Sequence, residues 1–581
     1  MKNPGTQSPP AASPQSGMAQ WAERLEQINQ AVDPFGIGAS FKAVAEGWMA
    51  NPDQLTAELA NLTRDLQALQ LSAWQTAIGL RPAQLVKPKA DDERFVDPIW
   101  TEAPAFSLLK QYYLLYTHWL EDVLFDAPGT PAEERRHAAF WARQWLNAIA
   151  PTNYLFTNPV ALRKFHETRG ESLTKGLKAW LDDVRTGCVE MVDRSAFKVG
   201  QNLATTPGAV VYRNDLIELI QYTPTTPKVH TVPIVIFPPW INKYYILDLT
   251  DKKSMLHYLV AQGFTVFVVS WRNPGAKQAD TTFDDYMMQG MREAIDVARK
   301  ICKTPQVHAV GYCIGGTALA ALMAWYNAEF PNARDVPVAH WTLLTTLVDF
   351  SRPGAIEVFL NEETINSLET MMAQKGYLDG REMERAFRML RSNSLIWHYF
   401  VHNYLYGETP PAFDVLYWNT DVTRLPRKMH SFYLREFYLH NKLFRKNGLT
   451  LAGHPIDLGR IRQPLYAVGC EEDHIAPWKA AFKIAERIAA PVTFTLSSSG
   501  HILGIINPPV TPPKRSYWSG PCTEKTPDEW RKEQDEIRGS WWGHWSKQLT
   551  KQCGPLIPAR QPGSKAYPPL TPAPGLYVHE V

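Results

Sequence analysis

The stretch VHAVGYCIGGTALA, residues 307–320, carries most of the information about the architecture of this chain. It begins as a short apolar run, passes through a turn flanked by glycines, and continues as a segment typical of a buried helix. The turn GYCIG, residues 311–315, fits the pattern Gly-x-nucleophile-x-Gly, in which a strand turns sharply into a helix. Serine usually occupies the tip of such a turn, but this chain has Cys313. The small residues Gly311 and Gly315 leave room for the strained backbone that the turn requires.

Two interpretations of Cys313 are open: a reactive nucleophile, or a small buried residue in a tight strand-to-helix contact. The glycines on both sides favour the nucleophile. The N-terminus of the following helix directs amide groups and a positive dipole toward the tip, which favours a negatively charged thiolate. The backbone amide of Ile314 is placed to donate to an oxyanion.

Short apolar runs recur along the second half of the chain and alternate with helical segments such as residues 286–301. Buried strands alternating with helices predict an α/β fold with a parallel sheet. A hairpin-like pair of strands is expected over residues 209–224. The predicted buried strands are VPIVIFPP (232–239), FTVFVVSW (264–271), QVHAVGY (306–312), HWTLLTTLV (340–348) and PLYAVGC (464–470).

An acid and a histidine follow the cysteine in chain order. Asp473 lies in the turn after the run 464–470, and His501 follows the strand-like run that starts at residue 491. The order Cys313, Asp473, His501 resembles the nucleophile–acid–histidine order of α/β-hydrolases. The neighbouring acids Glu471 and Glu472 compete with Asp473, whose later place in the turn favours it. His474 is expected to support the structure rather than act as the base.

A second oxyanion donor is expected from the loop after an early strand, here residues 238–242. The backbone amide of either Trp240 or Ile241 is the candidate, and the sequence does not choose between them.

The length, charge and cysteine content of the chain argue against several other classes of protein. Its 581 residues predict at least two domains. A net charge of +2 without a long basic stripe gives no electrostatic case for nucleic acid. Six cysteines without a C-x-x-C pair argue against a disulfide framework or a zinc site, so we expect no metal and no cofactor. The absence of a secretory signal and of a long apolar segment favours the cytoplasm.

The expected organisation has three parts: a disordered tail over residues 1–18, a mainly α-helical N-terminal domain over 19–200, and an α/β-hydrolase catalytic domain over 201–581. Apolar residues at helical spacing mark three segments of the helical domain, 18–32, 55–69 and 108–124. The stretch between the fourth and fifth predicted strands is much longer than a crossover needs. We therefore expect a helical, aromatic-rich cap inserted over about residues 350–450.

A cysteine nucleophile suits transfer of an acyl group between thioesters, because exchange between two sulfurs is nearly thermoneutral. It therefore favours an enzyme that takes an acyl group from a thioester such as acyl-CoA and passes it to an alcohol. A simple hydrolase has less need of a thiol.

From about residue 90 to the C-terminus, the chain resembles the poly(3-hydroxyalkanoate) synthases, and class I most closely. The resemblance rests on many strings in order, including GYCIGGT, INKYYILDL, VSWRNP, FDVLYWNTD, EEDHIAPW, SSGHILGIINPP and PAPGLYV. Leu503 departs from the small residue expected at that position in members that use short monomers.

The resemblance implies that Cys313 attacks (R)-3-hydroxybutyryl-CoA and that His501 is its base. Asp473 either orients His501 or activates the 3-hydroxyl of the next unit. The resemblance also implies a growing polyester chain, attachment to the surface of polyester granules in the cytoplasm, a homodimer and contacts with granule-associated proteins. Two alternatives are a thioesterase or depolymerase that releases free hydroxy acids, and a granule-coat protein without activity.

Overall fold

A computed structural model describes residues 33, 35–80, 82–89, 92–522 and 525–581. The predicted tail (1–18) and the predicted helical segment at 18–32 lie outside the described residues. By its internal contacts the chain divides into two compact units. The first contains the described residues up to Val160 together with Asn361–Ser367, and the second contains Ala161–Leu360 and Leu368–Val581.

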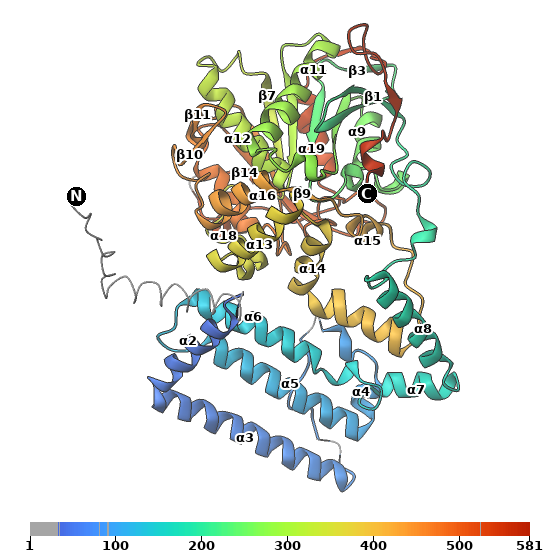
Figure 1. Ribbon diagram of the computed structural model, residues 1–581, viewed down its shortest axis with the longest axis vertical. Helices are drawn as coiled ribbons and strands as arrows, with labels where there is room; N and C mark the ends of the chain where they lie inside the picture. The colour runs from blue at the N-terminus through green and yellow to red at the C-terminus, as the bar shows by residue number, and fades with distance from the viewer. Residues whose placement is uncertain (1–32, 34, 81, 90–91, 523–524) are drawn as a thin grey trace, which may run out of the picture. The chain divides into compact units, whose positions relative to one another are not determined.

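The first unit is helical, as its periodicity predicts (Figure 1). Alanines of one helix, Ala138, Ala139 and Ala142, pack in a small core with Val44 and Trp48 of another. Small side chains on one helix let the other approach closely, so a narrow apolar stripe is enough to join them. The elements are α2 (Ile37–Met49), α3 (Pro52–Ala77), η1 (Glu93–Phe95), α4 (Ile99–Glu102), α5 (Pro104–Phe125), α6 (Ala132–Ala148) and η2 (Pro151–Asn153).

The second unit is built on an 11-stranded mixed sheet with the order β15-β14-β13-β12-β7-β6-β4-β5-β2-β1-β17. The six strands from β13 to β5 are parallel, and the flanking strands are antiparallel. All five predicted buried strands and the predicted hairpin are present. The strands are β1 (Gly208–Arg213), β2 (Ile217–Tyr222), β4 (Ile234–Phe237), β5 (Val266–Trp271), β6 (Val307–Tyr312), β7 (Val338–Leu344), β12 (Leu465–Cys470), β13 (Val492–Ser497), β14 (Ser516–Pro521), β15 (Ile537–Arg538) and β17 (Thr571–Pro572).

Two hydrophobic cores cover the two faces of this sheet. Alternate residues of β4 divide between them: Val235 and Phe237 enter one core, and Ile234 and Ile236 enter the other. This is the period-2 alternation of a strand that is buried on both faces. The first core packs on α11 (Glu293–Cys302) and α12 (Ile314–Glu329), and the second packs on α9 (Met255–Ala261) and α19 (Trp542–Gln552).

A helical insertion separates β7 from β12, as the spacing of the predicted strands indicates. It contains η8 (Ala355–Phe359), α13 (Glu362–Lys375), β8 (Tyr377–Leu378), α14 (Gly380–Leu390), η9 (Asn393–Trp397), η10 (Phe400–Leu405), α15 (Asp414–Asn419), β9 (Leu425–Pro426), α16 (Arg427–Phe432), η11 (Tyr433–Leu439), β10 (Leu449–Leu451), β11 (His454–Ile456) and η12 (Leu458–Arg460).

Residues 161–200, which the sequence pattern assigns to the helical N-terminal domain, belong to the second unit by their contacts. The reason is local: α8 (Glu171–Thr186) packs on η10 so closely that a Cβ on Gly176 would lie 1.9 Å from the carbonyl oxygen of Tyr404. Only glycine permits this approach.

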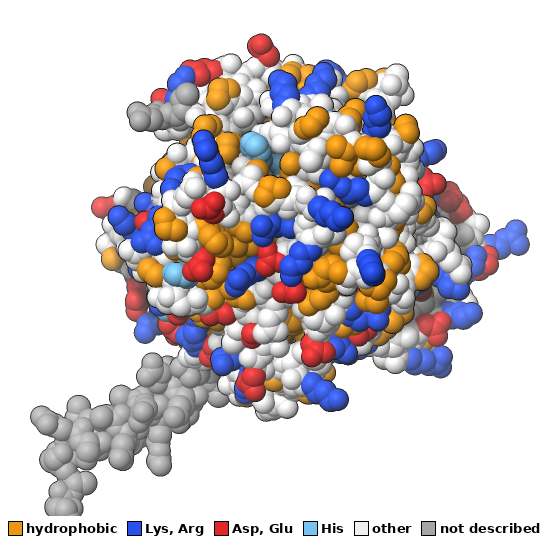
Figure 2. All heavy atoms as spheres, turned by 90° about the horizontal axis from the view of Figure 1, so that it is seen from above, with side chains coloured by type: hydrophobic (Ala, Val, Ile, Leu, Met, Phe, Trp, Pro, Cys, Tyr) orange, Lys and Arg blue, Asp and Glu red, His pale blue; other side chains and the backbone are white. Residues whose placement is uncertain are grey.

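The remaining elements of the second unit are α7 (Pro159–Glu167), which starts at the boundary, η3 (Arg194–Ala196), β3 (Lys228–His230), η4 (Tyr244–Leu247), η5 (Asp251–Lys253), η6 (Ala276–Gln278), α10 (Phe283–Asp285), η7 (Tyr286–Arg292), α17 (Trp478–Phe482), η13 (Lys483–Glu486), α18 (Pro527–Lys532), β16 (Leu556–Pro558) and η14 (Tyr577–His579). The face in Figure 2 carries charges of both signs among apolar side chains. Across the described residues, no helix combines the length and the apolar character that crossing a membrane requires.

Candidate active site

Cys313 lies at the tip of the predicted strand-to-helix turn, between β6 and α12. Its backbone is strained, with φ 53° and ψ −124°. Such a conformation is costly for a residue with a side chain and recurs at functional sites. The turn is held by hydrogen bonds from the Cys313 amide to Leu344 O (2.9 Å) and from the Thr317 amide to Cys313 O (3.1 Å).

The glycines around Cys313 are required by close backbone contacts. A Cβ on Gly311 would lie 2.5 Å from the Cα of Gly316, and a Cβ on Gly315 would lie 2.4 Å from Phe237 O and 2.7 Å from Pro238 O. No real Cβ tolerates these distances. The tip of the turn therefore lies directly against the loop that follows β4.

Asp473 and His501 form a buried pair. The Nδ1 atom of His501 lies 2.6 Å from Oδ2 of Asp473, and both residues are almost fully buried. The other carboxylate oxygen, Oδ1, accepts from the amides of Ile475 (2.9 Å) and Ala476 (2.8 Å). Both oxygens of Asp473 are thus occupied, and the carboxylate cannot rotate without losing bonds.

The competing residues of the same turn have other environments. Glu471 is exposed and pairs with Arg531 at 3.0 Å, and Glu472 is also exposed. Burial lowers the pKa of His474 to about 4, so this ring stays neutral at physiological pH. Within the described part of the chain, Asp473 is the one of these three acids that reaches a histidine.

His501 also adjoins Cys313. Burial by itself lowers the pKa of the His501 imidazole, but the charges of Asp473 and Cys313 and its hydrogen bonds with both side chains raise it to about 10. The ring stacks on Tyr312 at 5.8 Å between centroids, and the Tyr312 hydroxyl donates to His501 O at 3.1 Å. The structure therefore brings Cys313, His501 and Asp473 together in that order.

Two oxyanion donors were expected, the backbone amide of Ile314 and that of either Trp240 or Ile241. Among the described residues, none of the three donates to a protein acceptor. Ile314 is the first residue of α12, where the amide has no intrahelical partner. The other two lie in the loop after β4, where the Trp240 ring packs on Trp271 (5.4 Å between centroids).

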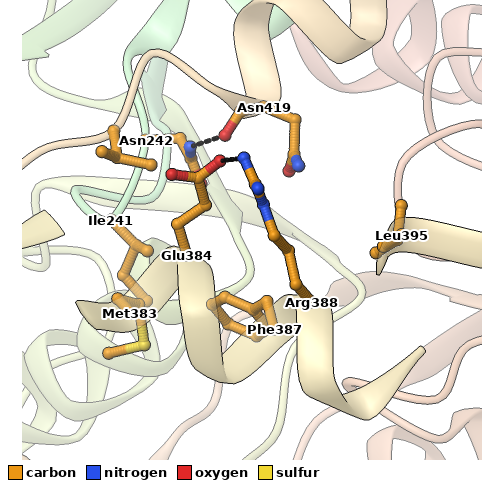
Figure 3. A pocket seen from close by; sticks show the side chains of 9 residues that line it. Ile241, Asn242, Met383, Glu384, Phe387, Arg388, Leu395 and Asn419 are labelled. Atoms are coloured by element: carbon orange, nitrogen blue, oxygen red, sulfur yellow. Dashed lines mark hydrogen bonds and ion pairs between the residues drawn. The ribbon is translucent and has the colours of Figure 1, made fainter. Parts of the chain in front are cut away.

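A pocket borders this loop (Figure 3). Ile241 and Asn242 form part of its wall, and Asn242 Nδ2 donates to Asn419 O at 3.4 Å across it. An ion pair between Arg388 and Glu384 of α14 faces the same space. The full lining is Ile241, Asn242, Met383, Glu384, Phe387, Arg388, Leu395, Asn419 and Val422.

Two residues near Cys313 were not predicted from the sequence. Tyr433 is buried and Tyr438 is half-buried, both in η11, and the pKa of each is raised, mainly by burial and in smaller part by the charge of Cys313. Their hydroxyls lie 3.5 Å apart. The aromatic richness of the insertion was visible in the sequence, but no local pattern shows which rings approach the cysteine.

Comparison with known proteins relates this arrangement to a family. The family described as "Poly-beta-hydroxybutyrate polymerase (PhaC) N-terminus" matches residues 91–259, and "alpha/beta hydrolase fold" matches residues 233–508. The chain is 42% identical over 539 residues to the poly(3-hydroxyalkanoate) polymerase of Methylorubrum extorquens, covering 92% of this chain and 88% of that protein. It is 40% identical over 534 residues to the poly(3-hydroxyalkanoate) polymerase subunit PhaC of Cupriavidus necator, covering 91% and 88%. The chain therefore belongs to the poly(3-hydroxyalkanoate) polymerase family and is an acyl-transferring enzyme with the α/β-hydrolase fold.

Proposed function

We propose that this enzyme polymerises (R)-3-hydroxyacyl-CoA, chiefly (R)-3-hydroxybutyryl-CoA, into a polyester with release of CoA, through an acyl group bound to Cys313. The observation that carries the proposal is the position of Cys313, on a strained turn beside the buried His501–Asp473 pair. The names of its relatives support the polyester product.

In the acylation step, His501 takes the proton of the Cys313 thiol and the sulfur attacks the carbonyl carbon of the thioester. The carbonyl oxygen becomes an oxyanion, which accepts hydrogen bonds from the Ile314 amide and from one amide of the loop after β4. When the intermediate collapses, the bond to the CoA sulfur breaks and His501 returns the proton to that sulfur. CoA leaves, and the acyl group is held as a thioester on Cys313.

In the elongation step, the 3-hydroxyl of an incoming hydroxyacyl-CoA attacks the carbonyl carbon of the chain on Cys313. His501 takes the hydroxyl proton, the new ester bond forms, and the proton passes to the departing Cys313 sulfur. The lengthened chain, now a CoA thioester, acylates Cys313 again and releases CoA. Each cycle forms one ester bond and releases one CoA.

The role of Asp473 in this scheme is to orient His501. Its hydrogen bond to Nδ1 leaves Nε2 as the ring nitrogen that exchanges protons with Cys313. The two backbone amides on its other oxygen keep the carboxylate in place for this role.

The test compares wild type, Cys313→Ala and Cys313→Ser with (R)-3-hydroxybutyryl-CoA, following CoA release and product size. Cys188→Ala, which changes another half-buried free thiol, is the matched control. We expect high-mass polyester from wild type and the control, none from Cys313→Ala, and very slow turnover by Cys313→Ser. Polyester from Cys313→Ala would move the nucleophile elsewhere. CoA release with only free hydroxy acid from wild type would indicate a thioesterase.

Monomer length and assembly are part of the same proposal. Leu503 and Cys313 both pack against the second hydrophobic core of the sheet, and comparing 3-hydroxybutyryl-CoA with 3-hydroxyoctanoyl-CoA measures how much chain the site accepts. We also propose a homodimer that associates with polyester granules in the cytoplasm and with granule-associated proteins. Sedimentation of the enzyme with and without polymer tests the first two of these properties.

A further inference from the structure

The segment 418–424 of the insertion binds the loop after β4 through several polar contacts, and we call it the clasp. The Trp418 indole donates to Lys243 O at 2.6 Å. Asp421 pairs with the Lys243 ammonium at 2.9 Å and accepts from the Tyr245 hydroxyl at 2.9 Å. These contacts join the insertion to the strand end from which an oxyanion donor is expected.

Thr423 makes the contacts closest to that donor. Its hydroxyl lies 2.5 Å from Trp240 O and 2.7 Å from Ile241 O, and its backbone amide donates to Ile241 O at 3.2 Å. Thr423 is buried, so water does not compete for these carbonyl oxygens. Through its hydroxyl and its backbone amide, Thr423 therefore restrains two consecutive peptide groups.

Restraining a carbonyl also orients an amide. A peptide group is planar and trans, so the N–H of one residue points opposite to the C=O of the residue before it. Thr423 holds the carbonyl of Trp240, and the Ile241 amide consequently points away from Thr423. Among the described residues that amide donates to no protein acceptor. The loop that carries it touches the cysteine turn, since a Cβ on Gly315 would lie 2.7 Å from Pro238 O.

Trp240 is the weaker candidate for the donor. Its amide belongs to the peptide group whose carbonyl is that of Pro239, and no hydrogen bond within the described residues restrains that carbonyl. Of the two residues left open by the sequence, Ile241 is the one whose amide direction is fixed.

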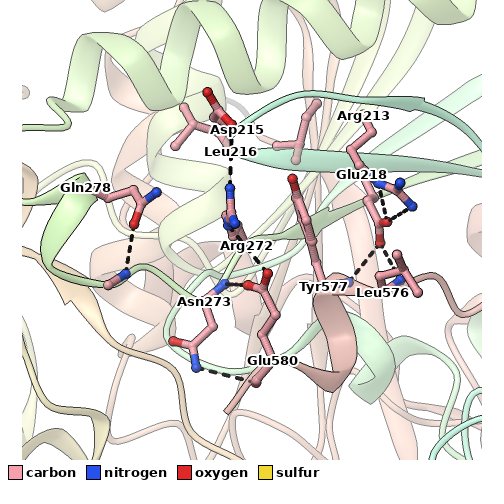
Figure 4. Close-up of polar contacts among 12 residues, drawn as sticks. Arg213, Asp215, Leu216, Glu218, Arg272, Asn273, Gln278, Leu576, Tyr577 and Glu580 are labelled. Carbon is pink, nitrogen blue, oxygen red and sulfur yellow. Dashed lines mark hydrogen bonds and ion pairs between the residues drawn. The ribbon is translucent and has the colours of Figure 1, made fainter.

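The clasp is itself anchored on its far side through Asn273, whose contacts with Glu580 are shown in Figure 4. The amide of Arg424 donates to Asn273 Oδ1 at 2.9 Å. Asn273 in turn donates from its backbone amide to Glu580 Oε2 at 3.1 Å and from Nδ2 to Glu580 O at 3.4 Å. Thr423 therefore has a fixed backbone from which its hydroxyl can restrain the loop.

We propose that Thr423 is a positioning residue, which directs the Ile241 amide at the oxyanion formed on the carbonyl that Cys313 attacks. This inference rests on the proposed function and adds to it the second donor and the residue that aims it. An interaction of this kind stabilises the transition state more than the bound substrate, so its loss lowers kcat and leaves KM nearly unchanged.

The test is Thr423→Val, which removes the hydroxyl at nearly constant volume, with Thr423→Ser to restore it. Loss of a direct oxyanion donor lowers kcat roughly 100- to 1000-fold. Because Thr423 acts through the Ile241 amide, we expect kcat for CoA release to fall about 10- to 100-fold in Thr423→Val. Thr423→Ser should recover most of that loss. Thr420→Val is the matched control, because its hydroxyl donates, as far as the described residues go, to Tyr417 O of the same insertion at 2.9 Å.

Alkylation of Cys313 by iodoacetamide, followed by peptide mass spectrometry, distinguishes a misdirected oxyanion donor from general damage to the active site. Alkylation needs the sulfur and His501 but forms no oxyanion, so its rate should stay unchanged in Thr423→Val. A wild-type kcat in Thr423→Val, or equal losses of alkylation and CoA release, would overturn the role of Thr423. Polyester from Cys313→Ala would instead overturn the proposed function, and the role of Thr423 with it.

Discussion

Replacing Asp473 by Asn removes one charge and one acceptor from the buried pair with His501 while keeping the shape of the side chain. In the native site one oxygen accepts from the amides of Ile475 and Ala476, and the other accepts from His501 Nδ1. Asn has a single oxygen, so it cannot serve both sides. Leaving these two amides, one buried and one half-buried, without an acceptor costs about 1–3 kcal/mol each, and the oxygen therefore stays on the amide side.

The NH₂ group of Asn then faces His501 and donates to Nδ1. Nδ1 must become the acceptor, the proton moves to Nε2, and the ring can no longer take a proton from Cys313. The charge of Asp473 is the first of the interactions that raise the pKa of His501 from 6.5 to about 10, a rise worth roughly 5 kcal/mol in total. Losing this charge together with the reactive tautomer should slow acylation about 10³- to 10⁴-fold, the range expected when an Asn replaces the acid of such a triad.

The assay is a rapid-quench measurement of the first CoA released per enzyme, followed by the steady-state yield of polyester. Glu472→Gln is the matched control, because it removes a carboxylate from the same turn at an exposed position. We expect Asp473→Asn to lose both the first release and the polymer. First release at the wild-type rate without polymer would refute the orientation of His501 and assign Asp473 to activation of the incoming hydroxyl.

Three further predictions concern packing and pH. Gly315→Ala should destabilise the fold by about 1–3 kcal/mol and lower kcat, because its Cβ would overlap Phe237 O and force the turn and the loop apart. Urea unfolding measures the first effect and CoA release the second. A wild-type kcat would contradict the importance of this close contact. Glu218→Ala should lower the free energy of unfolding by about 3–5 kcal/mol, because this fully buried carboxylate pairs with Arg213 and accepts hydrogen bonds from two amides of the C-terminal segment (Figure 4). Glu218→Gln should lower it less. Equal urea midpoints for wild type and Glu218→Ala would contradict this prediction. The raised pKa of His501 stabilises the folded state fully below about pH 6.5, and this contribution is lost as pH rises toward about 10. The free energy of unfolding in urea of wild type should therefore exceed that of His501→Gln by less at pH 9.5 than at pH 6.5. A constant difference would contradict the raised pKa.

Local patterns were enough to predict the strands and the cysteine turn. Each predicted strand is a short apolar run, because both faces of a parallel sheet are buried. The turn at Cys313 was recognisable because its neighbours must be glycine for reasons of contact, at Gly311 and Gly315. The α/β-hydrolase fold and the family followed from these features and from the strings shared with the family, and both are confirmed.

Other parts of the fold left no comparable pattern. The antiparallel strands β15 and β17 have two residues each, and β14 has six but is buried only over its first three, so no long buried apolar run marks any of them. The π-helical segments η9, η10 and η11 depend on packing within the insertion rather than on residue spacing. The place of α8 in the second unit depends on one close approach, at Gly176.

The amino-acid sequence by itself determined the chemical groups of the candidate site and their order along the chain. Only the tertiary structure decided how they meet, because contacts between residues far apart depend on how the elements pack. It brings Asp473 rather than its neighbouring acids to His501, a hydrogen bond across 28 residues. It also brings Thr423 to the carbonyl of Trp240 across 183 residues, the contact on which our choice of Ile241 over Trp240 rests.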